Sequence, residues 1–202
     1  YYLTHDERQR LAGSVHPALG QRGIPGTHDQ NRLFDDIDRL LAGHAGIIHL
    51  PRFNKGLDER DPLGRKLVLH GEPVRMVLEG WLIGIPPLPC ASEKPPSQDN
   101  ANHAKQSFVA QQHAKLHQAW CTRATALWTL AAPDLDTVRQ WRWQQEQDLP
   151  PHRRMLQSPA DVARFLTPFE PFIQHQLLHA PQWSDVLIQL DRDHYPHLQC
   201  PP

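Results

Sequence analysis

The sequence predicts an α+β fold dominated by helices, in which a helical N-terminal part with one β-hairpin is followed by a helical C-terminal part. Three observations lead to this prediction. Helix-capping residues precede apolar residues at helical spacing in both halves of the chain. A single stretch has the β-branched and apolar residues typical of paired strands. A segment rich in proline separates the two halves.

Two helices are expected before the hairpin. Thr4 and Glu7 match a capping box, which predicts a first helix that is ended or kinked by Pro17. Apolar residues recur at helical spacing over 29–41, and Gly43 is suited to end this second helix.

The hairpin is expected from strands at 67–69 and 74–85, joined by a turn at 70–73. Residues 54–65 look like a charged loop, because glycine and proline interrupt them. An isolated hairpin is marginally stable in water, so we expect it to pack on helices or on a third strand.

The domain organisation follows from the segment 86–102, which is read as a proline-rich linker or mobile loop. It separates a part at 1–85 from a part at 103–202, and the sequence leaves open whether both parts share one core. In the second part, helices are expected at 103–131, from Asp134 to about 148, from Ser158 to about 178, and from Ser184 to about 190.

The composition argues against several classes of protein. The net charge is -1 and the charged residues are spread evenly, without the basic arm typical of nucleic-acid binding. No apolar run approaches the roughly 20 residues of a membrane helix, so membrane insertion is not expected. The three cysteines, an odd number, favour reduced thiols in the cytoplasm over a disulfide framework.

One candidate metal site is the series His113, His117 and Cys121. On a helix these residues fall within about 80° of one another, on the apolar side. Imidazoles at positions i and i+4 can share an ion such as zinc. His113 and Cys121 would lie about 12 Å apart along the axis, so at most two of the three can bind one ion. The alternative is that all three pack beside Trp120 and Trp128.

A candidate partner-binding segment mixes aromatic and basic residues, a pattern that suits protein interfaces and stacking on nucleic-acid bases. Trp141 and Trp143 diverge by about 200° on a helix, so one of them is a candidate exposed anchor. The alternative is that both are covered. The segment comprises Arg139, Trp141, Arg142, Trp143, Arg153 and Arg154.

Other polar groups give weaker signals. His28 and Asp29 form a dipeptide known from metal phosphohydrolases, but no further ligands can be assembled around it. The acids at 35, 36 and 38 look like a solvated helix face, and the acids and histidines at 191–197 look like a solvated tail. The sequence contains no P-loop, no GxGxxG and no other glycine-rich phosphate cradle.

Without a catalytic motif, we predict a non-catalytic binding or assembly module, such as an accessory subunit or domain of a bacterial protein complex. This hypothesis expects a protein partner and no cofactor. A first alternative is a metal-dependent enzyme or sensor that uses His113, His117 or Cys121, with zinc as the metal. A second alternative is nucleic-acid binding through residues 139–154.

Overall fold

The chain forms two compact units in the computed structural model, which describes residues 1–88 and 100–199. Unit 1 comprises Tyr1–Ile83 and Cys90–Ala119, and unit 2 comprises Gly84–Pro89 and Trp120–Pro202. The predicted α+β class, rich in helix and with a hairpin in the N-terminal part, is confirmed. The predicted division at 86–102 stays a prediction, and most of that segment, 89–99, lies outside the described residues.

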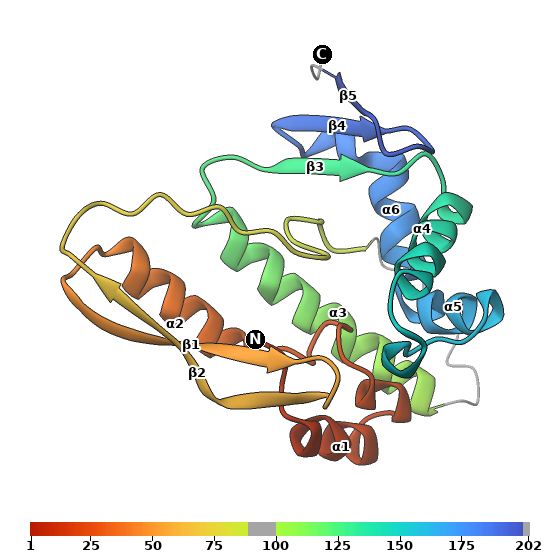
Figure 1. Ribbon diagram of the computed structural model, residues 1–202, viewed down its shortest axis with the longest axis horizontal. Coiled ribbons are helices and arrows are strands. Elements are labelled where there is room, and N and C mark those ends of the chain that lie inside the picture. The colour runs from red at the N-terminus through yellow and green to blue at the C-terminus, as the bar shows by residue number, and fades with distance from the viewer. Residues whose placement is uncertain (89–99, 200–202) are drawn as a thin grey trace. The chain divides into compact units, whose positions relative to one another are not determined.

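The secondary structure of unit 1 consists of helices and one antiparallel hairpin (Figure 1). Its elements are α1 (His5–Ser14), the 3-10 helix η1 (Pro17–Gly20), α2 (Gln30–Leu41), β1 (Gly46–Asn54), β2 (Glu59–Leu69) and most of α3 (Asn100–Cys121).

The two predicted helix starts in unit 1 are confirmed. Thr4 and Glu7 form the capping box of α1, and Asp29 caps α2 by accepting a hydrogen bond from the amide of Arg32. These caps satisfy amides that have no partner within the helix. The buried apolar residues of the unit include Leu19, Ile24, Leu33, Ile37, Leu40 and Ile48.

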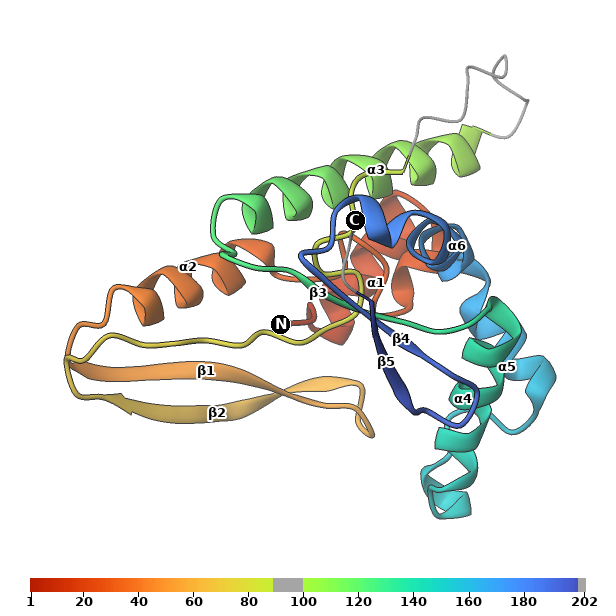
Figure 2. The ribbon, with the colours of Figure 1, turned by 90° about the horizontal axis from the view of Figure 1, so that it is seen from above.

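The hairpin exists, but its strands differ from those predicted. The predicted strand 67–69 is the end of β2, whereas the predicted strand 74–85 is wrong. β1 and β2 pair antiparallel from Gly46 opposite Leu69 to Asn54 opposite Glu59. The register shifts where Pro51 faces the segment 62–64, so the proline and glycine that made this region look like a loop sit in a bulge. Figures 1 and 2 show the segment after β2, which was predicted as a strand, as extended chain outside any sheet.

Unit 2 combines a small mixed sheet with short helices. Its elements are β3 (Trp128–Ala131), α4 (Leu135–Gln147), η2 (Pro151–Arg153), α5 (Pro159–Leu166), η3 (Thr167–Phe169), α6 (Glu170–His179), η4 (Ala180–Gln182), β4 (Val186–Leu190) and β5 (Pro196–Gln199). The strand order is β3-β4-β5, with β3 parallel to β4 and β5 antiparallel to it.

The sheet of unit 2 has one apolar face in a core and one face rich in exposed apolar residues. Ala131 and Leu187 pack with Ala180 beneath the sheet. On the alternate positions, Trp128 is 66% exposed and Leu130 is 57% exposed. Successive side chains on a strand point to opposite faces, which accounts for the pattern.

Two helices predicted in the C-terminal part of the chain differ from the structure, one in its length and the other in its type. α3 ends at Cys121, and residues 128–131 of the predicted long helix form β3 instead. The last predicted helix, from Ser184, is the strand β4. The predicted caps at Asp134 and Ser158 are confirmed. Among the described residues, no helix is long and apolar enough to cross a membrane.

Candidate functional site

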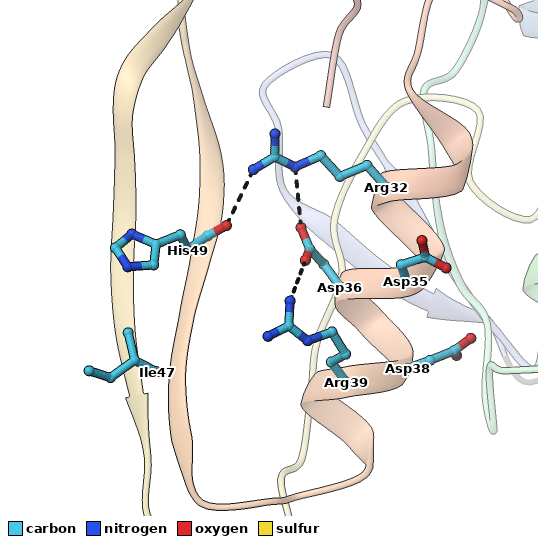
Figure 3. Close-up of a pocket in the computed structure, with 7 residues that line it drawn as sticks. All are labelled: Arg32, Asp35, Asp36, Asp38, Arg39, Ile47 and His49. Carbon is cyan, nitrogen blue, oxygen red and sulfur yellow. Dashed lines mark hydrogen bonds and ion pairs between the residues drawn. The ribbon is translucent and has the colours of Figure 1, made fainter.

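A charged groove in unit 1 is the main candidate site (Figure 3). It lies between α2 and β1 and has a volume of ≈ 670 Å³. The residues that line it are Arg32, Asp35, Asp36, Asp38, Arg39, Ile47 and His49. Arg32, Asp36 and Arg39 point toward β1, whereas the carboxylates of Asp35 and Asp38, which also line the groove, are directed away from β1.

Helical spacing brings the three inward charges together. Arg32, Asp36 and Arg39 are separated by four and three residues, and such positions share one face of a helix. Asp29, three residues before Arg32, continues the same stripe and pairs with Arg60 of β2 at 3.1 Å. Alternating charges therefore run along the side of α2 that faces the hairpin.

Asp36 is the centre of this groove and is only 5% exposed. Its carboxylate lies 3.8 Å from Nε of Arg32 and 3.9 Å from Nη1 of Arg39, and it accepts a hydrogen bond of 3.2 Å from the hydroxyl of Tyr1. Arg32 also reaches the carbonyl of His49 at 3.4 Å. A buried carboxylate that accepts a hydrogen bond from a hydroxyl and is flanked by guanidinium groups is suited to bind an alcohol next to an anion.

The loop that leads into α2 is tightly held. Arg8 is fully buried and donates to the carbonyl of Gly20 at 3.2 Å and to the side chain of Asp58 in the hairpin turn. Thr27, also fully buried, donates to the carbonyl of Ile24 at 2.7 Å. Arg8 thus connects α1 both to the loop and to the hairpin turn, and these contacts hold the loop that precedes α2 in place.

His28 lies in this loop, against Tyr2, with ring centroids 4.9 Å apart. Its Nδ1 atom is buried and has no hydrogen-bond partner among the described residues. Burial lowers the pKa of His28 from 6.5 to about 4, so the imidazole is neutral at neutral pH. A neutral histidine can accept a proton, but nothing in the geometry brings this one into the groove.

The predicted metal residues take different environments along α3. His113 is 1% exposed, His117 is half-buried and Cys121 is exposed, so the predicted burial of all three is wrong for the cysteine. Within the part of the chain that the structure describes, no three or more His, Cys, Asp or Glu side chains are grouped to hold a metal. Zinc binding stays a prediction, which elemental analysis of the purified protein tests.

Most of the basic residues in the predicted partner-binding segment are used within unit 2. Arg139 bonds Glu170 at 2.6 Å, and Arg142 pairs with the buried Glu146. Arg154 donates to the carbonyl of Leu149 at 3.0 Å, at the end of α4. These three guanidiniums stabilise the fold.

The remaining three residues of that segment differ in exposure. Trp141 and Trp143 are both half-buried, so neither is the exposed anchor that was expected. Trp141 stacks on His194, and its Nε1 donates to the carbonyl of Arg192 at 3.2 Å. Arg153 is exposed. A role for the segment in binding a protein or nucleic acid stays a prediction.

The groove was missed because its acids were read as a solvated helix face. That interpretation holds for the exposed Asp35 and Asp38 but is wrong for Asp36. The spacing of Arg32, Asp36 and Arg39 is visible in the sequence and could have indicated a paired stripe. The hydroxyl of Tyr1, which comes from a distant segment, could not be placed beside it.

Two curated proteins resemble the chain, and both are described as kinases. The chain is 24% identical to the uncharacterized kinase mug58 of Schizosaccharomyces pombe over 180 residues, which cover 85% of this chain and 65% of that protein. It is 31% identical to the probable ATP-dependent kinase TDA10 of Saccharomyces cerevisiae over 99 residues, which cover 44% of this chain and 33% of that protein. The chain is similar to kinases.

Two solved structures share the fold over 99% of the chain. The YGR205w protein superposes with a TM-score of 0.72 over 75% of its chain, and D-glycerate 3-kinase from Cryptococcus neoformans with 0.64 over 77% of its chain. Both are 19% identical to this chain, so these likenesses show the fold alone. No family model matches the sequence.

The kinase relatives overturn the prediction of a non-catalytic binding or assembly module, and with it the expectation that the protein is not an enzyme. The two alternatives, a metal-dependent enzyme or sensor and a nucleic-acid-binding protein, are not what these relatives indicate either. The chain contains no P-loop, GxGxxG or other short catalytic motif from which a kinase could have been predicted.

Proposed function

We propose that the chain belongs to a kinase-like phosphotransferase and that the groove between α2 and β1 binds the phosphate acceptor. The observation that carries this proposal is that both curated relatives are described as kinases. Because the chain spans 65% and 33% of those two proteins, the activity of a whole kinase is itself part of the proposal.

The chemistry of the groove supports the acceptor role. A kinase must hold an acceptor hydroxyl beside a group that takes its proton, and Asp36 already accepts such a hydrogen bond from Tyr1. The side chains of Arg32 and Arg39 are 44% and 63% exposed, so an incoming anion can reach N–H groups of both guanidiniums.

These features favour a small acceptor that carries both a hydroxyl group and a negative charge. The hydroxyl would replace that of Tyr1 at Asp36, and the anionic group would lie between Arg32 and Arg39. One structural relative is named as a kinase of D-glycerate, which is a hydroxy acid. Small hydroxy acids are therefore the first acceptors to test.

The phosphates of the donor need a cradle that this sequence does not contain. No P-loop or other glycine-rich phosphate cradle is present in the 202 residues. A third of the length of the S. pombe relative has no counterpart in the matched region. In this proposal a segment equivalent to that unmatched third supplies the cradle.

A reducing cytoplasm is the compartment that goes with this proposal. The three cysteines, an odd number, favour reduced thiols over a disulfide framework. An ATP-dependent reaction, as named for the S. cerevisiae relative, fits the same compartment.

The test has a binding arm and an activity arm. Calorimetric titration measures the binding of D-glycerate to the chain, with propionate as an acid of similar size that lacks hydroxyls. ADP formation in the presence of ATP, Mg²⁺ and the same acids is then followed, on this chain and on any longer polypeptide that contains it. We expect D-glycerate to bind more tightly than propionate and to stimulate ADP formation.

Matched variants locate the effect on α2. Asp36→Asn and Arg39→Gln should weaken D-glycerate binding, each by about tenfold, because each removes one charge-assisted hydrogen bond. Glu72→Gln, an exposed acid of unit 1 that does not line the groove, should leave it unchanged. Equal binding of D-glycerate to all three variants, or no acceptor-dependent ADP formation by any polypeptide tested, contradicts the proposal.

A further inference from the structure

The carboxyl ends of β3 and β4 meet at one edge of the sheet in unit 2. Because the two strands are parallel, the residues that follow them leave the sheet on the same side, as the arrows of Figure 1 show. Arg192 follows β4 and Asp134 follows β3. The two residues form an ion pair, with 3.3 Å between Nη2 and Oδ2, so both lie at this edge.

This edge is where α/β proteins commonly bind ligands. In open sheets with parallel strands, ligands lie outside the carboxyl ends of the strands, where the following loops diverge. Here the two loops do diverge, since one leads into α4 and the other turns back into β5.

The turn after β4, which carries His194, is held by hydrogen bonds to Asp191. Asp191 Oδ1 accepts hydrogen bonds of 2.9 Å from the amides of both Asp193 and Tyr195. His194 has a φ of 66°, in the left-handed region that non-glycine residues rarely adopt. A strained residue held by its surroundings is a common feature of binding sites.

The turn holds the imidazole of His194 flat against the indole of Trp141. The ring centroids are 4.3 Å apart and the planes are inclined by 25°. The indole is fixed from its other end, because Nε1 donates to the carbonyl of Arg192. Trp141 is half-buried and His194 is exposed, so the imidazole lies where another flat ring could stack on the indole in its place.

The charged groups of the edge complement a nucleotide. The side chain of Arg192 is 76% exposed, and its ion pair with Asp134 lies at the surface, where such pairs are weak. A phosphate can therefore recruit this guanidinium. Its departure would leave Oδ2 of Asp134 to accept a ribose hydroxyl, while Oδ1 still caps α4 through the amide of Thr137.

We propose that this edge, formed by Asp134, Trp141, Arg192 and His194, binds the purine nucleotide of the phosphate donor. The base stacks on Trp141 in place of His194, and Arg192 contacts a phosphate. The inference rests on the proposed kinase function, since that function implies a nucleotide donor. It adds the residues that recognise the nucleotide apart from the phosphate cradle.

The test is a titration of the full chain with ADP, followed by calorimetry and by tryptophan fluorescence. Adenosine and inorganic pyrophosphate serve as separate probes of stacking and of phosphate contact. We expect Arg192→Gln to weaken ADP binding by about tenfold and to leave adenosine binding unchanged, because it removes a charge-assisted contact. Trp141→Leu should weaken both ADP and adenosine by about tenfold or more.

Controls separate these effects from damage to the fold. Arg153→Gln removes an exposed arginine elsewhere in unit 2, and Trp143→Leu removes the tryptophan that lies about 200° around α4 from Trp141. Both should bind ADP normally. If Trp141→Leu does not fold, His194→Ala tests the stacking instead. It uncovers the indole without removing a core residue, so adenosine should bind more tightly than to wild type.

Two results overturn the proposal: ADP does not bind the wild-type chain, or it binds Arg192→Gln and the stacking variants as tightly as wild type. Binding of oligoadenylate without binding of ADP would also overturn it, in favour of an RNA contact. Failure here is distinguishable from failure of the proposed function. D-glycerate binding at Asp36 would persist in the first case, whereas in the second ADP would bind without any acceptor being phosphorylated.

Discussion

The hydroxyl of Tyr1 donates a hydrogen bond to the buried carboxylate of Asp36, with 3.2 Å between the oxygens. Burial and this negative charge both raise the pKa of Tyr1 far above its ordinary value of 10.0, so the phenol stays protonated and remains a donor. The tyrosine thus holds the place at Asp36 that the proposed acceptor would take.

Removal of this phenol should have opposite effects on stability and on ligand binding. Tyr1→Phe deletes one hydrogen bond to a charged group, and we expect the free energy of unfolding to fall by about 1–2 kcal/mol. The same change vacates the hydroxyl position at Asp36, so D-glycerate should bind more tightly. Urea denaturation and calorimetry measure the two effects. Weaker D-glycerate binding would show that Tyr1 supports the groove rather than competes for it.

Gly26 and Gly13 should respond in opposite directions to substitution by alanine. Gly26 has a φ of 98°, and a Cβ atom there would overlap the ring of Phe108. Gly26→Ala should therefore destabilise unit 1 by about 2–4 kcal/mol. Gly13 lies within α1, and a Cβ atom there would meet nothing within 4 Å beyond the backbone of its own helix and its chain neighbours, so Gly13→Ala should stabilise the protein by roughly 0.5–1 kcal/mol. Thermal melts of the two variants give the comparison.

His28 should make the protein sensitive to mild acid. Its pKa is about 4 in the folded protein against 6.5 ordinarily, so between these values the unfolded chain binds a proton that the folded chain does not. Stability should therefore fall as the pH drops from about 6.5 to about 4, by up to about 3 kcal/mol.

Two measurements check this dependence on His28. The ring proton resonances of His28 should titrate with a midpoint near 4 in NMR spectra. His28→Gln should remove the corresponding slope of stability against pH, whereas His70→Gln, at an exposed position, should retain it. A midpoint near 6.5 for His28 would contradict its burial as the cause.

Glu146 should contribute a second acid-sensitive step in unit 2. Burial alone would raise its pKa, but hydrogen bonds from Arg142 and from the amides of Leu156 and Met155 outweigh burial and hold the pKa below 4.5. The stability that it provides is present above about pH 4.5 and is lost as the pH falls through the lowered pKa.

Glu146→Gln tests this contribution. The substitution leaves the guanidinium of Arg142 without its anionic partner, and we expect a loss of about 2–3 kcal/mol at neutral pH. As the pH falls through the lowered pKa of Glu146, the difference from wild type should shrink, because the wild-type carboxylate becomes protonated. Urea midpoints from pH 7 to pH 3 measure both quantities. A difference that is independent of pH would exclude the charge of Glu146 as its source.

The sequence predicted those parts of the fold that depend on neighbouring residues. The caps at Thr4, Asp29, Asp134 and Ser158 are local hydrogen bonds, and all four are present. The strand β4 was read as a helix because Ser184 resembles another cap before a short apolar run. Its strand conformation comes from pairing with β3, which no local pattern records.

The candidate site was predictable only in part, for a similar reason. The stripe of Arg32, Asp36 and Arg39 is fixed by helix geometry and could be read from the sequence. The burial of Asp36 depends on Tyr1 and on β1, and the edge at Trp141 depends on a turn near residue 194. Both sites are assembled from distant segments by tertiary contacts.

The parallel pairing of β3 with β4 also sets an order of events during folding. All of α4, α5 and α6 lies between these strands, so the sheet needs a contact between segments far apart in the chain. Such contacts form slowly, because a long loop must close before they contribute any stability. During synthesis on the ribosome, α4, α5 and α6 emerge before β4, so the pairing of β3 with β4 cannot form until β4 has been made. The stretch from Val186 onward is therefore the segment whose arrival allows unit 2 to complete its core.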